Sequence, residues 1–455
     1  MMRLLEKEKV AFLLIGDLLA MGLAFSIALV LGHRPPVKLD LFSYYEWGIV
    51  TLFLANIIIF FIIDVYSLHK IPERFLHQVL LIGAGLFLSA ILVTFIFFFF
   101  RNTVPRAVFI LFYVISWGLI VLFRYLVGIL TLSRIYWKVI IVGGQKECGE
   151  IAQLINSRKY LHTRIVGYIS DEPDIGNMCG LAHFGPSSSL LSVVTREEPD
   201  QVIVATGIVG KELVKDLFDC MKHKVKVADF KKVIEAVSGK IPIDYLSDTW
   251  FIKELSDTDK RYFWYAKRSC DIIVSLIGLL LALPFLALMA IMIVIDSRGP
   301  IFYSQTRVGR GSRPFRVWKL RTMVSDADKS KVFWTTDNDS RITRIGRYLR
   351  KVRFDEVPQL INILKGEMSL IGPRPEAEAL VELYTKEIPY YLERHMVTPG
   401  ITGWAQINYS YGNSVDDTRE KLNYDFYYIK NRNMLLDLII FLRTIRIVMT
   451  GKGAL

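Results

Sequence analysis

The sequence IIVSLIGLLLALPFLALMAIMIVI at residues 272–295 decides how the chain is arranged at a membrane. It contains no charged residue, and it has the roughly 20-residue length that a helix needs to cross the hydrocarbon core of a bilayer. Pro284 lies in its middle, where proline removes a helix hydrogen bond and favours a kink. Lys and Arg flank the segment on both sides, and residues 299–321 contain no Asp or Glu.

Basic residues at both ends of an apolar segment favour a cytoplasmic position for both ends. We therefore expect a re-entrant helix at about residues 266–296, which enters the inner leaflet, breaks near Pro284 and returns. The alternative is an ordinary fifth span, which would place the rest of the chain on the opposite side of the membrane.

Four further apolar segments precede the re-entrant segment, and each is long enough to cross a bilayer. They lie at residues 10–31, 45–65, 79–100 and 107–130. Lys and Arg are more frequent on the flanks that share a side with the N-terminus, so both ends of this region are expected to be cytoplasmic. Asp17 and Asp64 lie within or at the edge of spans, where we favour a helix-end or inter-helix role over a functional one.

Composition agrees with a membrane protein of two or three domains. The 455 residues exceed one ordinary core, and 52% of them are hydrophobic. A formal net charge of +12 suits nucleic acid, an anionic membrane surface or phosphorylated substrates, and composition does not choose among them. The four cysteines are scattered, which argues for reduced cytosolic thiols and against a disulfide framework or a zinc site. A cleaved signal peptide is not expected.

Residues 135–250 show alternating strand and helix patterns. Short apolar stretches at 137–142, 165–169, 201–205 and 224–227 are typical of strands, and helical patterns follow at 147–158 and 211–221. This alternation predicts a parallel α/β sheet of Rossmann type. Gly143, Gly144 and Gly149 match a dinucleotide-binding loop only in part, so a structural or regulatory sheet is favoured over nucleotide binding.

The last region, residues 251–455, carries the densest pattern of polar residues. Asp355 and Glu356 are adjacent in the sequence RKVRFDEVPQ at residues 350–359. Adjacent carboxylates repel, so their position among cations suggests neutralisation by a metal or by phosphate-bound arginines. One carboxylate could attack phosphorus to give an acyl phosphate, and its neighbour could hold Mg²⁺. Taken alone, such a pair is more often a solvated helix face.

Two constrained loops follow the carboxylate pair. The sequence GEMSLIGPRP at residues 366–375 presents Arg374 between two prolines, and Arg is suited to bidentate recognition of phosphate. The sequence PGITGWAQ at residues 399–406 is a second constrained loop with an aromatic side chain available for packing. Either loop alone could be ordinary turn chemistry.

Taken together, these blocks resemble the bacterial sugar transferase family, the polyprenyl-phosphate phosphoglycosyltransferases of monotopic type. GPIFYSQTRVG at 299–309 and KLRTM at 319–323 precede the Asp-Glu, Gly-Pro-Arg-Pro and Pro-Gly-Ile-Thr-Gly-Trp blocks in the family's order. The four N-terminal spans and the Rossmann-like region resemble the large exopolysaccharide form. Tyr390-Tyr391, Arg394-His395, Tyr411-Gly412 and the tail at 451–453 resemble the subgroup associated with exosortase-linked loci.

The resemblance implies a nucleophile, a metal site and a set of binding residues. Asp355 matches the family's nucleophile, expected to attack the β-phosphate of a UDP-sugar, release UMP and hold the sugar phosphate covalently. Glu356 matches the partner that coordinates Mg²⁺, and Pro284 falls where the family's re-entrant helix breaks. Arg353-Phe354 departs from the Ser or Thr and Leu that often precede the pair. The expected substrate-binding residues are Lys319, Arg321, Arg350, Arg374 and Asp425.

The sequence therefore predicts an α-helical membrane region at 1–134, a Rossmann-like domain at 135–250 and a mainly α-helical monotopic phosphoglycosyltransferase domain at 251–455. The expected enzyme transfers sugar 1-phosphate from a UDP-sugar to polyprenyl (undecaprenyl) phosphate, which starts exopolysaccharide biosynthesis. It would lie in the bacterial inner membrane with its catalytic domain on the cytoplasmic side. Mg²⁺ is the expected cofactor and the lipid bilayer an expected partner, nucleic acid is not expected, and a homodimer is left open.

Three alternatives stay open at this point. The helical tail at 434–449 could lie on the inner leaflet or pack as a core helix. A membrane-anchored nucleotide-sugar dehydratase or epimerase would need a Tyr-x-x-x-Lys pair after the sheet, and the only such pair, Tyr66 and Lys70, precedes it. A non-catalytic scaffold would not need intact Asp-Glu and Gly-Pro-Arg-Pro blocks. The transferred sugar is not distinguished by any residue.

Overall fold

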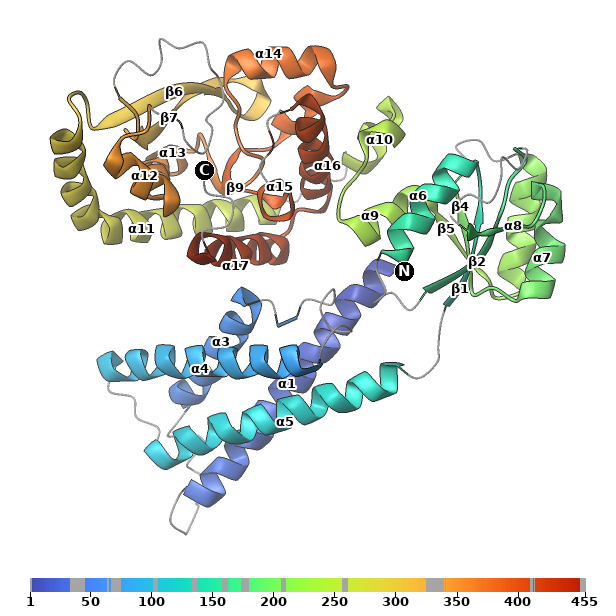
Figure 1. Ribbon diagram of the computed structural model, residues 1–455, viewed down its shortest axis with the longest axis horizontal. Coiled ribbons are helices and arrows are strands. Elements are labelled where there is room, and N and C mark those ends of the chain that lie inside the picture. Colours follow the sequence, from blue (N-terminus) through green and yellow to red (C-terminus); the bar gives the residue numbers. More distant parts are fainter. Residues whose placement is uncertain are drawn as a thin grey trace. The chain divides into compact units, whose positions relative to one another are not determined.

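The computed structural model describes most of the chain (Figure 1). The described residues are 2–32, 46–63, 65–66, 75–100, 105–132, 137–157, 163–172, 180–205, 210–255, 261–324, 339, 341–409, 412 and 414–450. Asp64, Lys70, Tyr411 and the tail at 451–453, which the sequence analysis singled out, lie outside them. The chain divides into two compact units, Met1–Gly239 and Lys240–Leu455, so the division falls before the expected boundary after residue 250.

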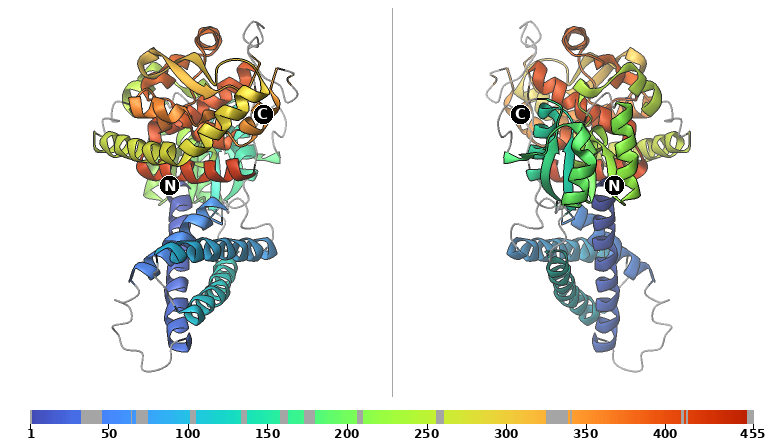
Figure 2. Two further views of the ribbon diagram at one scale, coloured as in Figure 1. Left: turned by 90° about the vertical axis from the view of Figure 1, so that its left-hand side faces the viewer. Right: turned by 90° about the vertical axis from the view of Figure 1, so that its right-hand side faces the viewer.

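The first unit begins with four apolar helices, as predicted. They are α1 (Met2–Gly32), α3 (Glu46–Ile62), α4 (Phe75–Phe100) and α5 (Arg106–Leu132). Helix α1 packs against α5, and α3 packs across α4 (Figure 2). Parts of α1, α4 and α5 are long and apolar enough to cross a membrane, whereas α3 is shorter. The chain is therefore a membrane protein.

A buried ion pair connects the first and last of these four helices. Arg124 on α5 donates through Nη2 to Asp17 Oδ2 on α1 at 2.6 Å and through Nε to Asp17 Oδ1 at 3.3 Å. Asp17 is fully buried, and the guanidinium of Arg124 lies over the ring of Tyr66, 5.3 Å from its centroid. The carboxylate thus has the inter-helix role that the sequence analysis favoured.

The middle region forms a five-stranded sheet in the order β3-β2-β1-β4-β5, with every neighbouring pair parallel. The strands are β1 (Trp137–Val142), β2 (Thr163–Ile169), β3 (Ala182–His183), β4 (Gln201–Val204) and β5 (Lys226–Asp229). In chain order a helix follows each of β1, β3 and β4 before the next strand, which is the alternation of a Rossmann-type sheet. The predicted fold of this region is confirmed.

Helices cover both faces of this sheet (Figure 1). They are α6 (Gln145–Asn156), α7 (Leu190–Glu197), α8 (Lys211–Lys222) and α9 (Phe230–Ser238). Leu190 and Val193 of α7 and Leu213 of α8 share one apolar cluster with Ile140 and Val202 of the sheet. Helix α6 packs beside α9. The sequence analysis missed β3, α7 and α9, because each has fewer than ten residues and periodicity is read over a window of about 11–18 residues.

The second unit is mainly helical, with two small sheets. Its longest element is α11 (Arg261–Asp296), and β6 (Phe302–Val308) and β7 (Pro314–Leu320) form an antiparallel pair after it. Two further short strands, β8 (Ser369–Ile371) and β9 (Gly400–Thr402), pair in parallel. The remaining elements are η5 (Ile243–Tyr245), α10 (Asp248–Leu255), η7 (Arg310–Ser312), α12 (Arg344–Lys351), η9 (Phe354–Glu356), α13 (Gln359–Lys365), α14 (Glu378–Glu387), η10 (Tyr391–Met396), α15 (Trp404–Asn408), α16 (Val415–Asn431) and α17 (Met434–Thr450).

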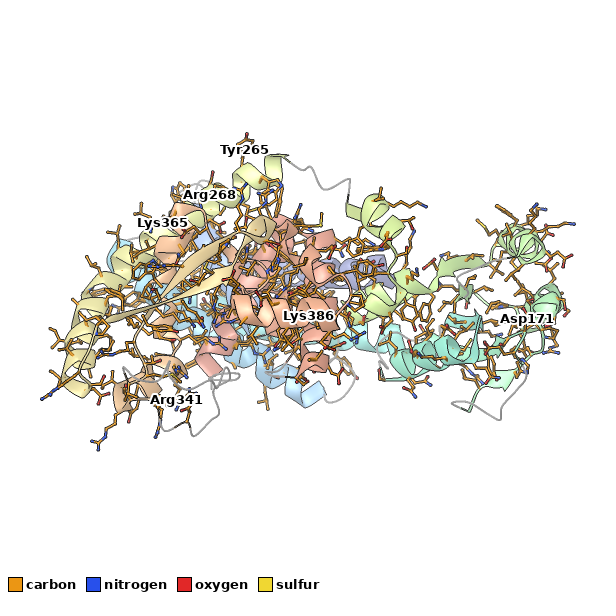
Figure 3. The ribbon with its side chains drawn as sticks, turned by 90° about the horizontal axis from the view of Figure 1, so that it is seen from above. Asp171, Tyr265, Arg268, Arg341, Lys365 and Lys386 are labelled. Carbon is orange, nitrogen blue, oxygen red and sulfur yellow. The ribbon has the colours of Figure 1, made fainter. Side chains whose placement is uncertain are left out.

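The first half of α11 is attached to the second unit by polar contacts. Lys267 forms an ion pair with Asp437 of α17 at 2.6 Å, and Asp271 accepts a hydrogen bond from the backbone N–H of Leu370 at 3.0 Å. Arg268 donates to the carbonyls of Ile363 and Leu364, the last turn of α13, and therefore lies beside Lys365 (Figure 3). A charged residue at the end of a helix that satisfies free carbonyls is a stabilising cap.

The second half of α11 is attached to the same unit by different contacts. Ile293 packs with Leu320 of β7 and Leu349 of α12 in one apolar cluster. Asp296 accepts from the backbone N–H of Ile345 at 2.9 Å, and Arg321 donates to the carbonyl oxygen of Ser297 at 2.6 Å. Both ends of this helix are therefore attached to one compact body.

Between its two attached ends α11 exposes apolar side chains. Leu280, Leu281 and Phe285 are 62%, 70% and 59% exposed, and Pro284 lies among them within the helix. The ribbon changes direction part-way along the helix (Figure 1). Proline in a helix interior removes a hydrogen bond and clashes with the preceding turn, which is a sufficient cause for such a change of direction.

Helix α17 packs on one face and is exposed on the other. Leu436 and Ile440 lie in a buried cluster with Ile371 and Tyr428, which matches the core-helix alternative for this tail. Leu435 and Leu438 lie on the opposite face and are more than half exposed. Contact of this second face with the inner leaflet stays a prediction.

Candidate active site

Asp355 and Glu356 form a short 3₁₀ turn, η9, immediately after α12. Arg353 separates the two elements and has a left-handed backbone conformation with φ 55°. This conformation costs a non-glycine residue about 1–2 kcal/mol, and it reverses the chain tightly enough to turn both carboxylates inward. Asp355 and Glu356 are 7% and 8% exposed. The pair is thus buried and does not form the solvated helix face that two such residues, taken alone, would favour.

Glu356 is held by two cations. Its Oε1 atom accepts from Nζ of Lys319 on β7 at 2.9 Å and from Nη2 of Arg374 at 2.6 Å. Burial alone would raise the pKa of Glu356, but Arg374 and Lys319 hold it well below its usual range. Burial lowers the pKa of Lys319, and the neighbouring Glu356 acts in the opposite direction. Glu356 is therefore a fixed anion at the centre of a charge cluster.

Asp355 differs from its neighbour because, within the described residues, its carboxylate makes no hydrogen bond and no ion pair. Burial raises the pKa of Asp355, against the attraction of Lys319 nearby. The Asp355 oxygens are not fully enclosed, so a carboxylate that no protein donor holds is open to an incoming group. Asp355 thus has the properties of a reactive group, whereas Glu356 has those of a positioning group.

Arg350 is placed next to the pair by the loop after β7. Its Nε donates to Oγ1 of Thr322 at 2.9 Å, one residue beyond Arg321. Helix α12 approaches this loop so closely that a Cβ atom on Gly346 would lie 2.1 Å from the Thr322 carbonyl oxygen. Only glycine allows this approach, so Gly346 brings the last turn of α12, and with it Arg350, to the site.

The Arg374 loop rests directly on the loop at residues 399–406. A Cβ atom on Gly372 would lie 2.4 Å from the Thr398 carbonyl oxygen, and one on Gly400 would lie 2.1 Å from the Gly372 nitrogen. The two glycine-containing blocks recognised in the sequence therefore pack backbone against backbone. The close approach allows β8 and β9 to pair in parallel, and it places Arg374 opposite Glu356.

Two of the expected binding residues have other contacts in the structure. Arg321 is 5% exposed and donates to the end of α11, although its Nε and Nη1 atoms lack hydrogen-bond partners in the described part of the chain. Asp425 on α16 is 2% exposed and forms an ion pair with Arg394 at 2.8 Å. Burial raises the pKa of Asp425, against Arg394. Neither described side chain forms a hydrogen bond or an ion pair with Asp355 or Glu356, and their role in substrate binding stays a prediction.

Sequence reasoning missed the residues that hold the Arg374 loop. Arg307 of β6 donates to the Pro375 carbonyl oxygen, and Arg394 of η10 donates to the Arg374 carbonyl oxygen at 3.0 Å. Both arginines lie inside recognised blocks, but spacing along the chain gave no indication that they converge on one loop. Thr322, the partner of Arg350, was missed for the same reason.

The glycine loop of the middle region is filled by the chain's own carboxylates. The backbone N–H of Gln145, at the start of α6, donates to Oε2 of Glu172 at 3.0 Å. A Cβ atom on Gly144 would lie 2.4 Å from Oε2 of Glu147 and 3.2 Å from Oε1 of Glu172. A helix N-terminus binds phosphate through such N–H groups, and here a carboxylate already accepts one of them. This geometry favours the structural alternative for the sheet.

Comparison with known protein families gives two matches. A family described as bacterial sugar transferase matches residues 262–451, and one described as CoA-binding domain matches residues 61–227. The carboxylates beside Gly144 do not fit the phosphates of coenzyme A at the start of α6, because like charges repel.

Several curated proteins are similar to this chain. One is UDP-N-acetylgalactosamine-undecaprenyl-phosphate N-acetylgalactosaminephosphotransferase from Aeromonas hydrophila, 41% identical over 52% of this chain and 55% of its own length. Another is UDP-glucose:undecaprenyl-phosphate glucose-1-phosphate transferase from Xanthomonas campestris pv. campestris, 30% identical over 68% of this chain and 66% of its own length. A third is exopolysaccharide production protein PSS from Rhizobium leguminosarum bv. phaseoli, 41% identical over 41% of this chain and 97% of its own length.

The matched part of this chain spans 55% to 66% of the length of the first two relatives and nearly all of the third. The shared region contains the carboxylate pair and both glycine-containing loops.

Proposed function

Because this chain belongs to the bacterial sugar transferase family, we propose that it transfers a sugar 1-phosphate from a UDP-sugar to polyprenyl phosphate. The proposal includes a covalent intermediate on Asp355, release of UMP and a polyprenyl-diphosphate sugar as product. This product would be the first lipid-linked intermediate of an exopolysaccharide. The names of the relatives supply the classes of donor and acceptor.

One observation carries the mechanistic part of the proposal. Of two adjacent buried carboxylates, Glu356 is held by Lys319 and Arg374, whereas Asp355 has no hydrogen-bond or ion-pair partner among the described residues. A nucleophile must have an oxygen lone pair free to approach phosphorus, and it must lie among cations that attract a diphosphate. Asp355 meets both requirements.

The first step exchanges one bond to phosphorus for another. A carboxylate oxygen of Asp355 attacks the β-phosphorus of the UDP-sugar, and the bond from that phosphorus to the bridging oxygen breaks. UMP leaves with the electron pair, and the sugar phosphate remains on Asp355 as an acyl phosphate. Lys319, Arg350 and Arg374 surround the pair with positive charge, which stabilises the charge that develops on the phosphoryl oxygens.

The second step restores the enzyme. A phosphate oxygen of the polyprenyl phosphate attacks the phosphorus of the acyl phosphate, the acyl–oxygen–phosphorus bond breaks, and Asp355 returns as a carboxylate. Two sequential displacements split one difficult transfer into two easier ones, and they predict ping-pong kinetics.

Mg²⁺ is the proposed cofactor, and the residues at the site fit it. Mg²⁺ in proteins is commonly bound by one or two carboxylates together with the phosphates of the substrate. Both oxygens of Asp355 and Oε2 of Glu356 have no hydrogen-bond partner among the described residues, and no group of three such ligands occurs there. Glu356 would hold the ion, and when bound the ion would neutralise the diphosphate of the donor.

The path of α11 supports a position of the site at the cytoplasmic face of the inner membrane. A straight helix of 36 residues would be about 54 Å long, more than a bilayer core of about 30 Å, and its ends would lie on opposite sides. Both ends of α11 instead contact one compact unit, and its exposed apolar middle contains Pro284. We propose that α11 is re-entrant, so that a soluble donor and a lipid acceptor can meet at the site.

The proposed reaction is tested with the purified full chain in nanodiscs that contain undecaprenyl phosphate. A panel of UDP-glucose, UDP-galactose and UDP-N-acetylgalactosamine is supplied with Mg²⁺, and UMP is measured. At least one donor should give UMP together with a lipid-linked sugar, and Asp355→Asn should lower the rate by about 10³-fold or more. A chain that acts only as a scaffold would release no UMP with any donor. Retention of wild-type activity by Asp355→Asn would refute the assignment of the nucleophile.

A further inference from the structure

The loop that carries Arg374 is fixed almost entirely through its carbonyl groups. Pro373 and Pro375 lack an N–H group, so the backbone on either side of Arg374 has few donors of its own. Four consecutive carbonyl oxygens each accept a hydrogen bond from a different donor. The donors are the Gly400 N–H to Pro373 at 2.9 Å, Arg394 Nη2 to Arg374 at 3.0 Å, Arg307 Nη1 to Pro375, and the Val308 N–H to Glu376 at 3.0 Å.

Arg394 is the most deeply buried of the side chains that hold this loop. It is 6% exposed, and its guanidinium contacts three partners. Nη2 donates to Oδ2 of Asp425 at 2.8 Å and to the Arg374 carbonyl oxygen at 3.0 Å, and Nη1 donates to the hydroxyl of Tyr391 at 2.7 Å. One nitrogen therefore connects a carboxylate on α16 with the backbone of the active-site loop.

Asp425 is buried, and its carboxylate forms an ion pair with Arg394. Its side chain is 3% exposed, and that of Arg394 is 7% exposed. A buried arginine needs a counter-ion, and the planar guanidinium has its hydrogen bonds in fixed directions. The position of Arg394, and with it that of the Arg374 carbonyl, thus depends on the charge and position of Asp425.

We propose that Asp425 and Arg394 are a positioning pair that places the Arg374 guanidinium against Glu356. This inference rests on the proposed function, and it replaces the expectation that Asp425 touches the substrate. The order of action is Asp425 to Arg394, Arg394 to the Arg374 backbone, and the Arg374 side chain to Glu356 at 2.6 Å. Asp425 then affects the reaction only through Arg374.

The test is a double-mutant cycle in the full chain, with kcat/KM for UMP release as the measured quantity. Asp425→Asn keeps the shape of the side chain and removes its charge, and it should lower kcat/KM about 10- to 100-fold, since a displacement of about 1 Å can cost as much. In an Arg374→Gln background the same substitution should cost less than about threefold, because the side chain that it positions is already absent. If Asp425 instead bound the substrate or had only a structural role, Asp425→Asn would lower kcat/KM by the same factor in both backgrounds.

Two further variants make the outcome decisive. Tyr391→Phe removes only the hydroxyl that accepts from Arg394, so it gives a milder loss with the same dependence on Arg374 if Asp425→Asn does not fold. Glu420→Gln is the matched control, because Glu420 also lies on α16 and forms an ion pair, with Lys240 at 2.6 Å, away from the loop. It should leave kcat/KM within about twofold in both backgrounds.

The results also separate this inference from the proposed function. A wild-type chain that releases no UMP with any donor contradicts the proposed function itself. A wild-type chain that is active, with full activity in Asp425→Asn or with multiplicative losses in the Arg374→Gln background, contradicts the positioning pair alone.

Discussion

Asp355 and Glu356 are adjacent carboxylates that differ in their hydrogen-bond partners and in the direction of their pKa shifts. Glu356 has two cationic partners within 2.9 Å, and its pKa is held well below its usual range although burial alone would raise it. Asp355 is equally buried, has no such partner in the described part of the structure, and has a raised pKa. Glu356 is therefore suited to hold charge in place, and Asp355 is suited to react. Pairs of titratable groups whose surroundings move their pKa values apart are a common property of active sites.

His395 provides a test of burial by pH. Its Nδ1 contacts Oγ of Ser312 at 3.2 Å, its Nε2 lacks a partner in the described residues, and burial with Arg394 beside it lowers its pKa from 6.5 to about 4. The folded pKa lies below the unfolded one, so the unfolded chain binds the proton first. The contribution of neutral His395 to the free energy of unfolding is therefore fully present above pH 6.5 and is lost as the pH falls toward 4. The loss between pH 7 and 5 is about 2 kcal/mol.

The measurement is the thermal unfolding midpoint of the purified protein between pH 5 and 8. His395→Gln should reduce its dependence on pH, whereas His223→Gln, at an exposed residue after α8, should leave it unchanged. An unaltered pH dependence in His395→Gln would mean that this imidazole has the same pKa in the folded and the unfolded chain.

At the scale of elements, α11 combines two kinds of surface. Its charged residues contact the rest of the second unit, and its middle is apolar and exposed. The charged residues are Lys267, Arg268, Asp271 and Asp296. Hydropathy alone describes this helix as a span. The basic flanks and Pro284 indicated a different path from the sequence, and the contacts at both ends support that path.

Cysteine labelling tests the path of α11 directly. In a cysteine-free background, Tyr265→Cys and Arg298→Cys mark positions before and after the apolar stretch. A membrane-impermeant maleimide should react with neither in intact spheroplasts and with both in inverted vesicles, because both ends are cytoplasmic. Asn102→Cys, between the expected third and fourth spans, is the control that should react in spheroplasts. Reaction of Arg298→Cys, without Tyr265→Cys, in spheroplasts would indicate an ordinary span.

In the ion pair between α1 and α5, loss of one charge should destabilise the protein more than loss of both charges. Asp17→Leu leaves Arg124 buried without a counter-ion, which typically costs about 3–5 kcal/mol. Asp17→Leu combined with Arg124→Met removes both charges and should recover most of the loss, since apolar replacements of buried pairs are often neutral. Thermal unfolding midpoints in nanodiscs measure both variants. A double variant as unstable as Asp17→Leu alone would assign the pair a role other than charge compensation.

Elements were predictable from the sequence to the extent that periodicity marks them. The strand at Trp137–Val142 and the four apolar helices were recognised because each has a strong local pattern. The short β3, α7 and α9 were missed, because each is shorter than the window over which a periodic pattern is read. The glycine loop was correctly recognised as imperfect, but its occupation by Glu172 depends on a contact between residues far apart in the sequence.

At the scale of the whole molecule, the candidate site and the family match both lie in the second unit. The bacterial sugar transferase match covers residues 262–451, and the Rhizobium relative is matched over 97% of its own length by 194 residues. We therefore predict that a fragment of residues 240–455 in nanodiscs retains UMP release. Its kcat/KM should lie within about tenfold of the full chain, a difference of about 1.4 kcal/mol. A folded but inactive fragment would show that the first unit takes part in catalysis.

Motifs predicted five residues that lie close together in the structure, but they did not predict the contacts among these residues. Asp355, Glu356, Lys319, Arg350 and Arg374 were identified from motifs, and the structure brings them together at one place. Which carboxylate is held and which is free could not be derived from their adjacency. That Arg394 connects Asp425 with the Arg374 loop also required the fold, because these residues come from three separate segments.

The most direct measurement is a search for the sugar phosphate on Asp355. The purified chain is incubated with its UDP-sugar and Mg²⁺ in the absence of polyprenyl phosphate, quenched and digested, and the peptide that contains Asp355 is examined by mass spectrometry. The proposed mechanism predicts one added sugar phosphate on Asp355, with UMP released in equal amount, and neither product in Asp355→Asn. UMP release that requires polyprenyl phosphate, with an unmodified Asp355 peptide, would contradict the covalent intermediate.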